Sequence, residues 1–250
     1  MIDIHNHSLW QIDDGSNNQE STLEMLKKAK NFGFETVVVT PHIRWGLFNN
    51  SHEIIKQKFQ ECIEMFEREM ANIPQIIPGC EYYFDDHLLE LVRKKEILTL
   101  GENGKYFLTE FPYMSIPLGY ERILFEMQVA GFIPVIAHIE RYLETQNKID
   151  FAESLFDAGC VLQIDIGSVI GLYGKHAKKC SLRLLELGLC HVLATDAHKP
   201  EQYEPICGEA LSFIQKKIGT EALQTLMFAN QQVLISGGNK DDIQLLRDIL

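Results

Sequence analysis

Short runs of apolar, β-branched residues alternate along the chain with longer stretches in which apolar residues recur every three or four positions. The short runs are bounded by glycine, proline or charged residues, which is typical of buried parallel strands. The longer stretches have the spacing of amphipathic helices. One of them opens at Ser51 and carries apolar residues at positions 55, 59, 62, 66 and 70. The predicted strands are Ile2–Ile4, Thr36–Thr40, Gln75–Cys80, Lys105–Phe111, Ile133–Ala137, Val161–Ile166 and His191–Thr195.

Helices are predicted between these strands. Ser21 and Glu24 have the form of a capping box, and Gly33 is expected to end that helix. Seven strand–helix units without a linker favour either an α/β barrel or a doubly wound sheet. Further helices are predicted near 86–95, 119–130, 149–158, 177–187, 207–218 and 220–229. We therefore expect one domain over residues 1–236, followed by a short helical tail over residues 237–250.

Residues that commonly bind metal follow six of the seven predicted strands. In a parallel barrel all carboxyl ends of the strands meet on one face, whereas a doubly wound sheet gathers only those near its switch point. The pattern therefore favours a barrel with its site on that face. The candidate ligands, in chain order, are His5, His7, Asp14, His42, Glu81, Glu110, His138, Asp196 and His198.

The chemistry of this set points to a cluster of ions. His5 and His7 point the same way along an extended segment because strand side chains alternate. Imidazoles and carboxylates without a nearby thiolate suit Zn, Mn or Fe. Nine ligands are too many for one ion and suit two or three, with a bridging carboxylate. Asp3 is expected to orient a histidine, Asp13 is the neighbour most easily confused with Asp14, and Asp165 stays undecided.

Cationic residues indicate what such a cluster acts on. A metal cluster activates water and either holds phosphoryl oxygens or polarises a carbonyl. Arg44 and Arg141 closely follow two candidate ligands and can overhang the same face, where arginine pairs bidentately with phosphate. An amidohydrolase would share the two N-terminal histidines but would place a lysine where this chain has Glu110. The C-x5-R spacing at Cys62 lies within a predicted helix and lacks the glycines of a thiol-based phosphatase.

Composition excludes several classes. The net charge of 23 − 35 = −12 disfavours general binding to nucleic acid or to anionic lipid. The six cysteines form no C-x-x-C pair, which argues against a zinc ribbon or a disulfide framework. No secretory signal pattern and no apolar run of about 20 residues is visible, so we expect a cytoplasmic protein without membrane insertion.

The motifs that carry these residues resemble the polymerase-and-histidinol-phosphatase (PHP) superfamily. Within it, the chain is similar to the manganese-dependent protein-tyrosine phosphatases of bacterial capsule and exopolysaccharide operons. The His-Ile-Glu-Arg-Tyr run at 138–142 is narrower than the superfamily pattern and carries most of this assignment. The other motifs lie at 1–7, 13–15, 40–42, 79–83 and 195–198.

The resemblance implies a distorted (β/α)7 TIM-like barrel with a trinuclear cluster. We expect two or three divalent ions, with Mn as the metal and Fe, Zn or Mg as alternatives. The resemblance also implies that the nine candidates are the ligands, that Glu81 bridges ions and that Arg141 binds substrate phosphate. The implied substrate is a phosphotyrosine protein, namely the tail of a membrane-associated bacterial tyrosine autokinase. The implied reaction is attack of metal-bound hydroxide on phosphorus.

One departure from the family and two alternatives stay open. Relatives often carry a further arginine in the loop after the last Asp-x-His, where this chain has Lys199 as the only cation in 199–205. This departure bears on phosphate affinity and phosphotyrosine preference, and not on hydrolysis itself. The alternatives are a small-molecule phosphatase of the histidinol-phosphatase type and a catalytically silent metal-binding regulator. The sequence leaves the oligomeric state open.

Overall fold

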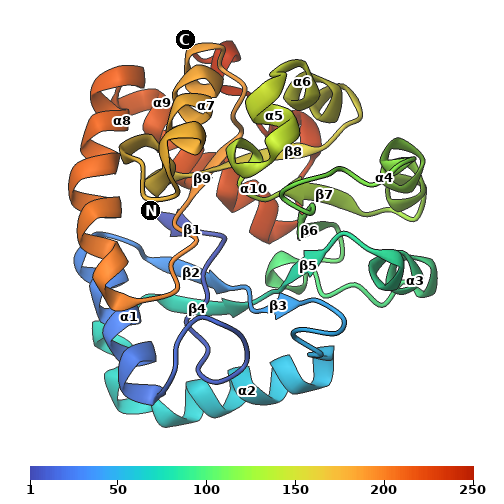
Figure 1. The fold of residues 1–250 in the computed structure, drawn as a ribbon. Coiled ribbons are helices and arrows are strands. Elements are labelled where there is room, and N and C mark those ends of the chain that lie inside the picture. Colours follow the sequence, from blue (N-terminus) through green and yellow to red (C-terminus); the bar gives the residue numbers. More distant parts are fainter.

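The computed structural model describes residues 1–250 except for the side chain of Met70, so the apolar position predicted there lies outside the described residues. All strand pairs are parallel, and the strands form the inner layer of an α/β barrel (Figure 1). The strands are β1 (Ile2–Asp3), β2 (Thr36–Val39), β3 (His42–Ile43), β4 (Gln75–Pro78), β5 (Glu81–Tyr83), β6 (Tyr106–Glu110), β7 (Ile133–Ile136), β8 (Val161–Asp165) and β9 (Val192–Ala194).

All seven predicted strands are present, and two of them are followed by further short strands, β3 and β5, that the sequence did not predict. Pro41 has no N–H to donate, and it separates β2 from β3. Gly79 separates β4 from β5, and a side chain there would meet Val38 at 2.8 Å. Each pair of short strands is one stave of the barrel, because the Glu81 N–H still donates to the carbonyl of Pro41 at 3.1 Å.

The barrel closes between its first and last strands. Asn6 bridges to Ala197 in parallel, and the N–H of Asp196 donates to the carbonyl of His5 at 3.0 Å. One side of the barrel is distorted, because β4 pairs with β2 but not with β6. Leu100, which is fully buried, packs in the barrel interior at this gap. The prediction of a distorted seven-stave barrel, made of one domain, is confirmed.

Helices surround the strands (Figure 1). The helix at residue 19 begins earlier than predicted, because the side chain of Asn18, not Ser21, caps it by accepting from the Ser21 N–H at 2.8 Å. The helices are α1 (Gln19–Asn31), α2 (His52–Met65), α3 (Asp86–Lys94), α4 (Tyr120–Val129), α5 (Leu143–Asn147), α6 (Asp150–Asp157), α7 (Lys175–Glu186), α8 (Leu211–Ile218), α9 (Thr220–Gln224) and α10 (Asn230–Ser236). The short helices α5 and α10 were not predicted.

The C-terminal segment closes the end of the barrel at which the strands begin. Leu234 of α10 and Ile243 lie in the apolar cluster that fills the barrel interior. The hydroxyl of Tyr106 donates to the carbonyl of Gly238 at 3.0 Å, and Asn230 donates to the carbonyl of His191 at 2.6 Å. The predicted tail helix is instead two 3-10 turns, Lys240–Asp242 and Leu246–Asp248. We call the opposite end, where the strands finish, the mouth.

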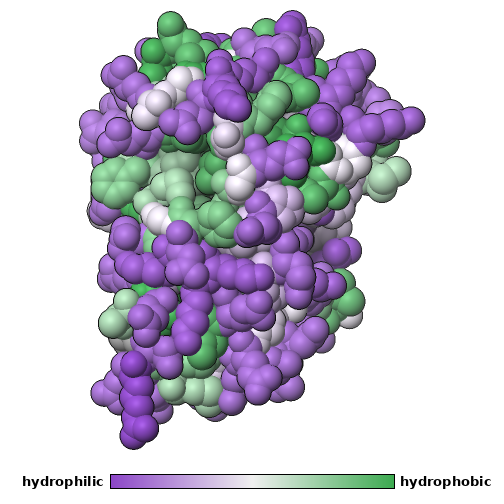
Figure 2. All heavy atoms as spheres, turned by 90° about the vertical axis from the view of Figure 1, so that its left-hand side faces the viewer, coloured by the Kyte–Doolittle hydropathy of each residue, from purple (hydrophilic) through white to green (hydrophobic). Residues whose placement is uncertain are grey.

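On the face around α1 and α8, hydrophilic side chains cover most of the surface and apolar areas lie between them (Figure 2). None of the helices in the described part of the chain is both long and apolar enough to cross a membrane.

Candidate metal centre

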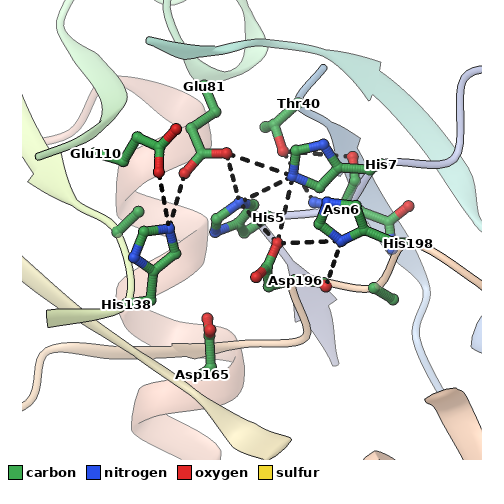
Figure 3. Close-up of polar contacts among 12 residues, drawn as sticks. His5, Asn6, His7, Thr40, Glu81, Glu110, His138, Asp165, Asp196 and His198 are labelled. Carbon is green, nitrogen blue, oxygen red and sulfur yellow. Dashed lines mark hydrogen bonds and ion pairs between the residues drawn. The ribbon is translucent and has the colours of Figure 1, made fainter. Parts of the chain in front are cut away.

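The nine candidate ligands meet at the mouth, and ligand atoms from all nine fall into four overlapping groups. Figure 3 shows His5, His7, Glu81, Glu110, His138, Asp196 and His198 of this set. His138 and Asp196 follow β7 and β9 with positive φ angles of 33° and 48°. Non-glycine residues in this region are strained, and such strain is concentrated at functional sites. Both side chains point toward the centre of the mouth (Figure 3).

Glu81 is the centre of the arrangement. Its Oε2 lies 3.2 Å from Nε2 of His5 and 3.0 Å from Nδ1 of His42. Its other oxygen, Oε1, lies 3.1 Å from Nε2 of His138. Glu110 lies on the same side, with carboxylate oxygens 3.6 Å from His42 and 3.7 Å from His138. One buried carboxylate therefore contacts histidines from three different strand ends.

Asp196 joins the rest of the set. Its Oδ1 lies 3.2 Å from Nε2 of His5 and 3.3 Å from Nε2 of His7. His198 lies 3.5 Å from the same oxygen through Nδ1, and its Nε2 lies 3.5 Å from Asp14. Asp14 is the most exposed of the nine, with 58% of its side chain accessible, so this group forms the solvent side of the centre.

The donor geometry fits metal ions better than mutual hydrogen bonds. Nδ1 of His42 and Oε2 of Glu81 are 3.0 Å apart, yet both are buried without a hydrogen-bond partner among the described residues. The Nε2 atoms of His5 and His7 approach within 3.1 Å. Two nitrogens bound at about 2.1 Å to one ion, at roughly a right angle, would lie about 3 Å apart. The atoms point at shared positions, as ligands do.

Electrostatics support the same interpretation. Burial, and then repulsion by Glu81, raise the pKa of Glu110 to about 7. Burial opposes ionisation of Glu81 as well, but the facing His5 and His42 hold its pKa well below the usual range. Burial lowers the pKa of His138 to about 4, whereas for His5 burial is outweighed by the facing Glu81 and Asp196, which raise the pKa to about 10. Buried carboxylates at this density are compensated by cations.

Two residues orient the N-terminal histidines, and the sequence did not assign them this role. Asp13 accepts from Nδ1 of His7 at 2.8 Å, and Gln163 Oε1 lies 3.0 Å from Nδ1 of His5. Both leave Nε2 of the histidine facing the centre, which is how outer residues fix a metal-binding imidazole. No local motif marks Gln163, because it comes from the middle of β8.

The prediction that Asp3 orients a histidine is wrong. Its carboxylate accepts from the hydroxyl of Thr195 at 2.6 Å, from the Thr195 N–H at 3.0 Å and from Asn6 at 3.1 Å. Its only contact with His5 is with the backbone N–H, at 3.4 Å. Asp3 therefore fastens the first stave to the last one and touches no imidazole ring among the described residues.

The two arginines line the pocket at the metal centre, a cavity of about 180 Å³, but their guanidinium groups have different partners. Arg141 is held by Asp196 at 2.6 Å and by Asp165 at 3.3 Å. Arg44 lies with its guanidinium 4.1 Å from the ring centroid of Tyr83 and makes no ion pair with any described residue. Lys199 is exposed and does not line this pocket.

The histidines outside the set also have defined places. His176 is exposed, and His52 contacts the hydroxyl of Tyr82 at 2.6 Å. His191 is buried and accepts from the Leu162 N–H at 3.0 Å. His87 lies beside Trp45, with ring centroids 5.2 Å apart. These four do not join the centre.

A closed parallel barrel with histidines and carboxylates gathered at its mouth defines a class, the α/β-barrel proteins that hold divalent metal at the carboxyl ends of their strands. Within that class, the chain belongs to the family described as "Capsular polysaccharide synthesis, CpsB/CapC", which it matches over residues 1–236.

Individual relatives agree with this assignment. The chain is 35% identical to the tyrosine-protein phosphatase CpsB of Streptococcus pneumoniae, over 94% of this chain and 98% of that protein. It is 33% identical to the tyrosine-protein phosphatase YwqE of Bacillus subtilis, over 94% of this chain and 91% of that protein. One crystal structure belongs to a pair, YwqE and CpsB, that is described as "unique metal-dependent tyrosine phosphatases". It superposes on this chain with a TM-score of 0.87. The two chains are 32% identical, and the superposition covers 96% of each.

Proposed function

We propose that this chain is a metal-dependent protein-tyrosine phosphatase that acts in capsular polysaccharide synthesis. The observation that carries the proposal is the convergence of nine metal-type side chains, seven of which line one pocket together with two arginines. Relatives of 33% and 35% identity that are named tyrosine-protein phosphatases support it. The finer proposal is that the substrate is the phosphorylated tail of a tyrosine autokinase.

Four overlapping groups of side chains would hold two or three divalent ions, with manganese as the proposed metal. Glu81 belongs to two of these groups, which suits a bridging carboxylate. Mixed nitrogen and oxygen donors without a thiolate suit such an ion. When bound, the ions supply Lewis acidity and lower the pKa of water toward neutrality. The groups are His5, His7 and Glu81; His5, His138 and Asp196; His42, Glu81 and Glu110; and His7, Asp14, His42 and His198.

The protein's own residues bind and orient the phosphate. Arg44 is available to pair with nonbridging oxygens, because it makes no competing ion pair with a described residue. Arg141 is already fixed by Asp165 and Asp196, so it presents its remaining N–H groups in a set direction. A phenolate leaving group has a pKa of about 10, which makes a dedicated general acid unnecessary.

The test is a comparison of three substrates with metal-loaded protein: a phosphotyrosine peptide, the same peptide with phosphoserine, and histidinol phosphate. We expect the phosphotyrosine peptide to have the highest kcat/KM. Faster turnover of histidinol phosphate would favour the small-molecule alternative, and no turnover of any substrate by fully loaded protein would contradict the proposal.

Replacing Arg44 should weaken substrate binding. A charge-assisted hydrogen bond contributes about 1.5–3 kcal/mol, so R44A should raise KM roughly tenfold or more while kcat changes less. R44K should recover part of the loss, since lysine keeps the charge but not the bidentate fork. Steady-state kinetics with R122A as the control, on the exposed face of α4, would measure this. An unchanged KM in R44A would show that Arg44 does not touch phosphate.

Replacing Asp13 should weaken metal binding although all nine proposed ligands stay unchanged. Loss of the carboxylate that fixes a metal-binding histidine typically costs about 10–100-fold in affinity. D13A should therefore need that much more Mn²⁺ for half-maximal loading, measured by competition with a chelating dye. The matched control is D157A, at the exposed end of α6. Equal affinity in D13A and wild type would remove Asp13 from this role.

A further inference from the structure

Exposed apolar side chains are concentrated around the mouth of the barrel. Among the described residues, seven of the fourteen large apolar side chains that remain exposed lie in segments that follow β3, β6, β7 and β8. Such a grouping beside a polar site, in a protein of net charge −12, indicates contact with a ligand. The seven are Trp45, Leu47, Tyr113, Met114, Leu118, Leu143 and Leu172.

Two of these side chains, Leu47 and Tyr113, line the same pocket as the metal centre, and we call them the apolar rim. Leu47 is 59% exposed and Tyr113 is 36% exposed. The floor of the pocket is the opposite in character, since Glu81 and Asp196 are buried and charged. A ligand in this pocket therefore meets charge at its inner end and apolar surface at its outer end.

The segment that carries Leu47 is a tight turn. The N–H of Arg44 donates to the carbonyl of Phe48 at 3.0 Å, and the N–H of Phe48 donates back at 2.8 Å. Gly46 has a φ of 85°, which favours glycine there. The ring of Phe48 stacks on the ring of His42, with centroids 5.3 Å apart. Leu47 is thereby anchored to a proposed metal ligand and held at the pocket.

Tyr113 is anchored to the other side chains of the site. Its carbonyl accepts from the N–H of Leu143 at 2.9 Å. Its ring lies 5.4 Å from that of His138, and the Arg141 guanidinium lies 4.8 Å from its centroid. A side chain held in this way loses little conformational entropy when a ligand binds to it.

We propose that the apolar rim of Leu47 and Tyr113 binds the aromatic ring of the substrate and selects aryl over alkyl phosphomonoesters. This inference rests on the proposed function. Once the phosphate reaches the buried floor, the group attached to its ester oxygen lies at the rim. A phenyl ring covers both apolar side chains there, whereas the short arm of phosphoserine leaves them in water and brings polar backbone to the rim. The rim thereby makes the tyrosine preference a property of the pocket itself.

The experiment measures binding of two phosphonates to metal-loaded protein by calorimetry. Phenylphosphonate and methylphosphonate carry the same anionic group, so the ratio of their Kd values isolates the ring. We expect wild type to bind phenylphosphonate about tenfold more tightly. Y113A and L47A should each reduce this ratio at least about threefold, while Y113F should keep it, since it retains the ring. The control is F125A, which removes an exposed aromatic ring from α4.

Each outcome has one interpretation. Wild type without a preference for phenylphosphonate, or a ratio unchanged in both Y113A and L47A, would overturn the assignment of the rim. Equal weakening of both phosphonates in the variants would also overturn it, because it would reflect damage to the centre. Failure of wild type to hydrolyse a phosphotyrosine peptide would contradict the proposed function instead, and the calorimetric ratio would still decide whether the rim binds an aryl ring.

Discussion

Replacing Glu81 with glutamine is expected to abolish most of the phosphatase activity while leaving the fold intact. Glu81 approaches His5, His42 and His138 and belongs to two of the ligand groups, so E81Q removes one negative charge from the point where the groups meet. Glutamine has nearly the same shape and keeps one oxygen donor. Loss of a single well-placed electrostatic contact costs about 10²–10³ in kcat, and loss of a bridging ligand should cost at least about a thousandfold.

The measurement pairs turnover with metal content and thermal unfolding. E81Q should bind fewer ions per chain than wild type, and its Tm without metal should lie within a few degrees of that of metal-free wild type. E90Q, on the exposed side of α3, is the matched control and should behave as wild type. Wild-type turnover and metal content in E81Q would contradict the proposed centre, whereas unfolding would be visible as a collapse of Tm.

Removing metal should inactivate the protein and also destabilise it. Glu81, Glu110 and Asp196 are nearly completely buried, and their mutual repulsion opposes folding unless cations compensate it. A ligand present at a thousandfold excess over its Kd stabilises the native state by about 4 kcal/mol. For a chain of this length, each kcal/mol shifts Tm by about 2–4 °C, so chelation should lower Tm by roughly 10 °C.

Scanning calorimetry before and after chelation, followed by readdition of Mn²⁺, would measure the effect. E81Q is a useful reference here, because chelation should shift its Tm much less than that of wild type. Full phosphatase activity in protein that elemental analysis shows to be free of metal would contradict the proposed function. Recovery with Mn²⁺ but not with Mg²⁺ would support manganese as the working ion.

The ligand set could be predicted from the sequence because it depends on local signals. Each candidate follows an apolar run that reads as a buried strand, and a barrel brings all such ends together whatever the loops between them do. The sequence therefore predicted the strands, the barrel and the nine residues that converge. The boundaries of single elements were less secure, because strand pairing resumes after Pro41 and Gly79 as β3 and β5, beyond the ends of the predicted strands.

What the sequence missed depends on contacts between distant segments. Asp13 and Asp3 are both carboxylates near a histidine in the chain, yet only Asp13 meets an imidazole. Asp3 is drawn to Thr195, which is 192 residues away, by the closure of the barrel. Gln163 orients His5 from across the interior. No spacing rule distinguishes such partners, because the side-chain directions are set only when the staves assemble.

Closure of the barrel at the end where the strands begin has a consequence for product release. Since α10 and the segment after it close the end where the strands begin, a ligand reaches the pocket from the mouth. In the proposed mode of binding, the phosphate lies at the buried floor of the pocket and the tyrosine ring lies at its rim. With this arrangement we expect the dephosphorylated polypeptide to leave before orthophosphate. Orthophosphate therefore competes with each incoming substrate, so its build-up slows the enzyme down.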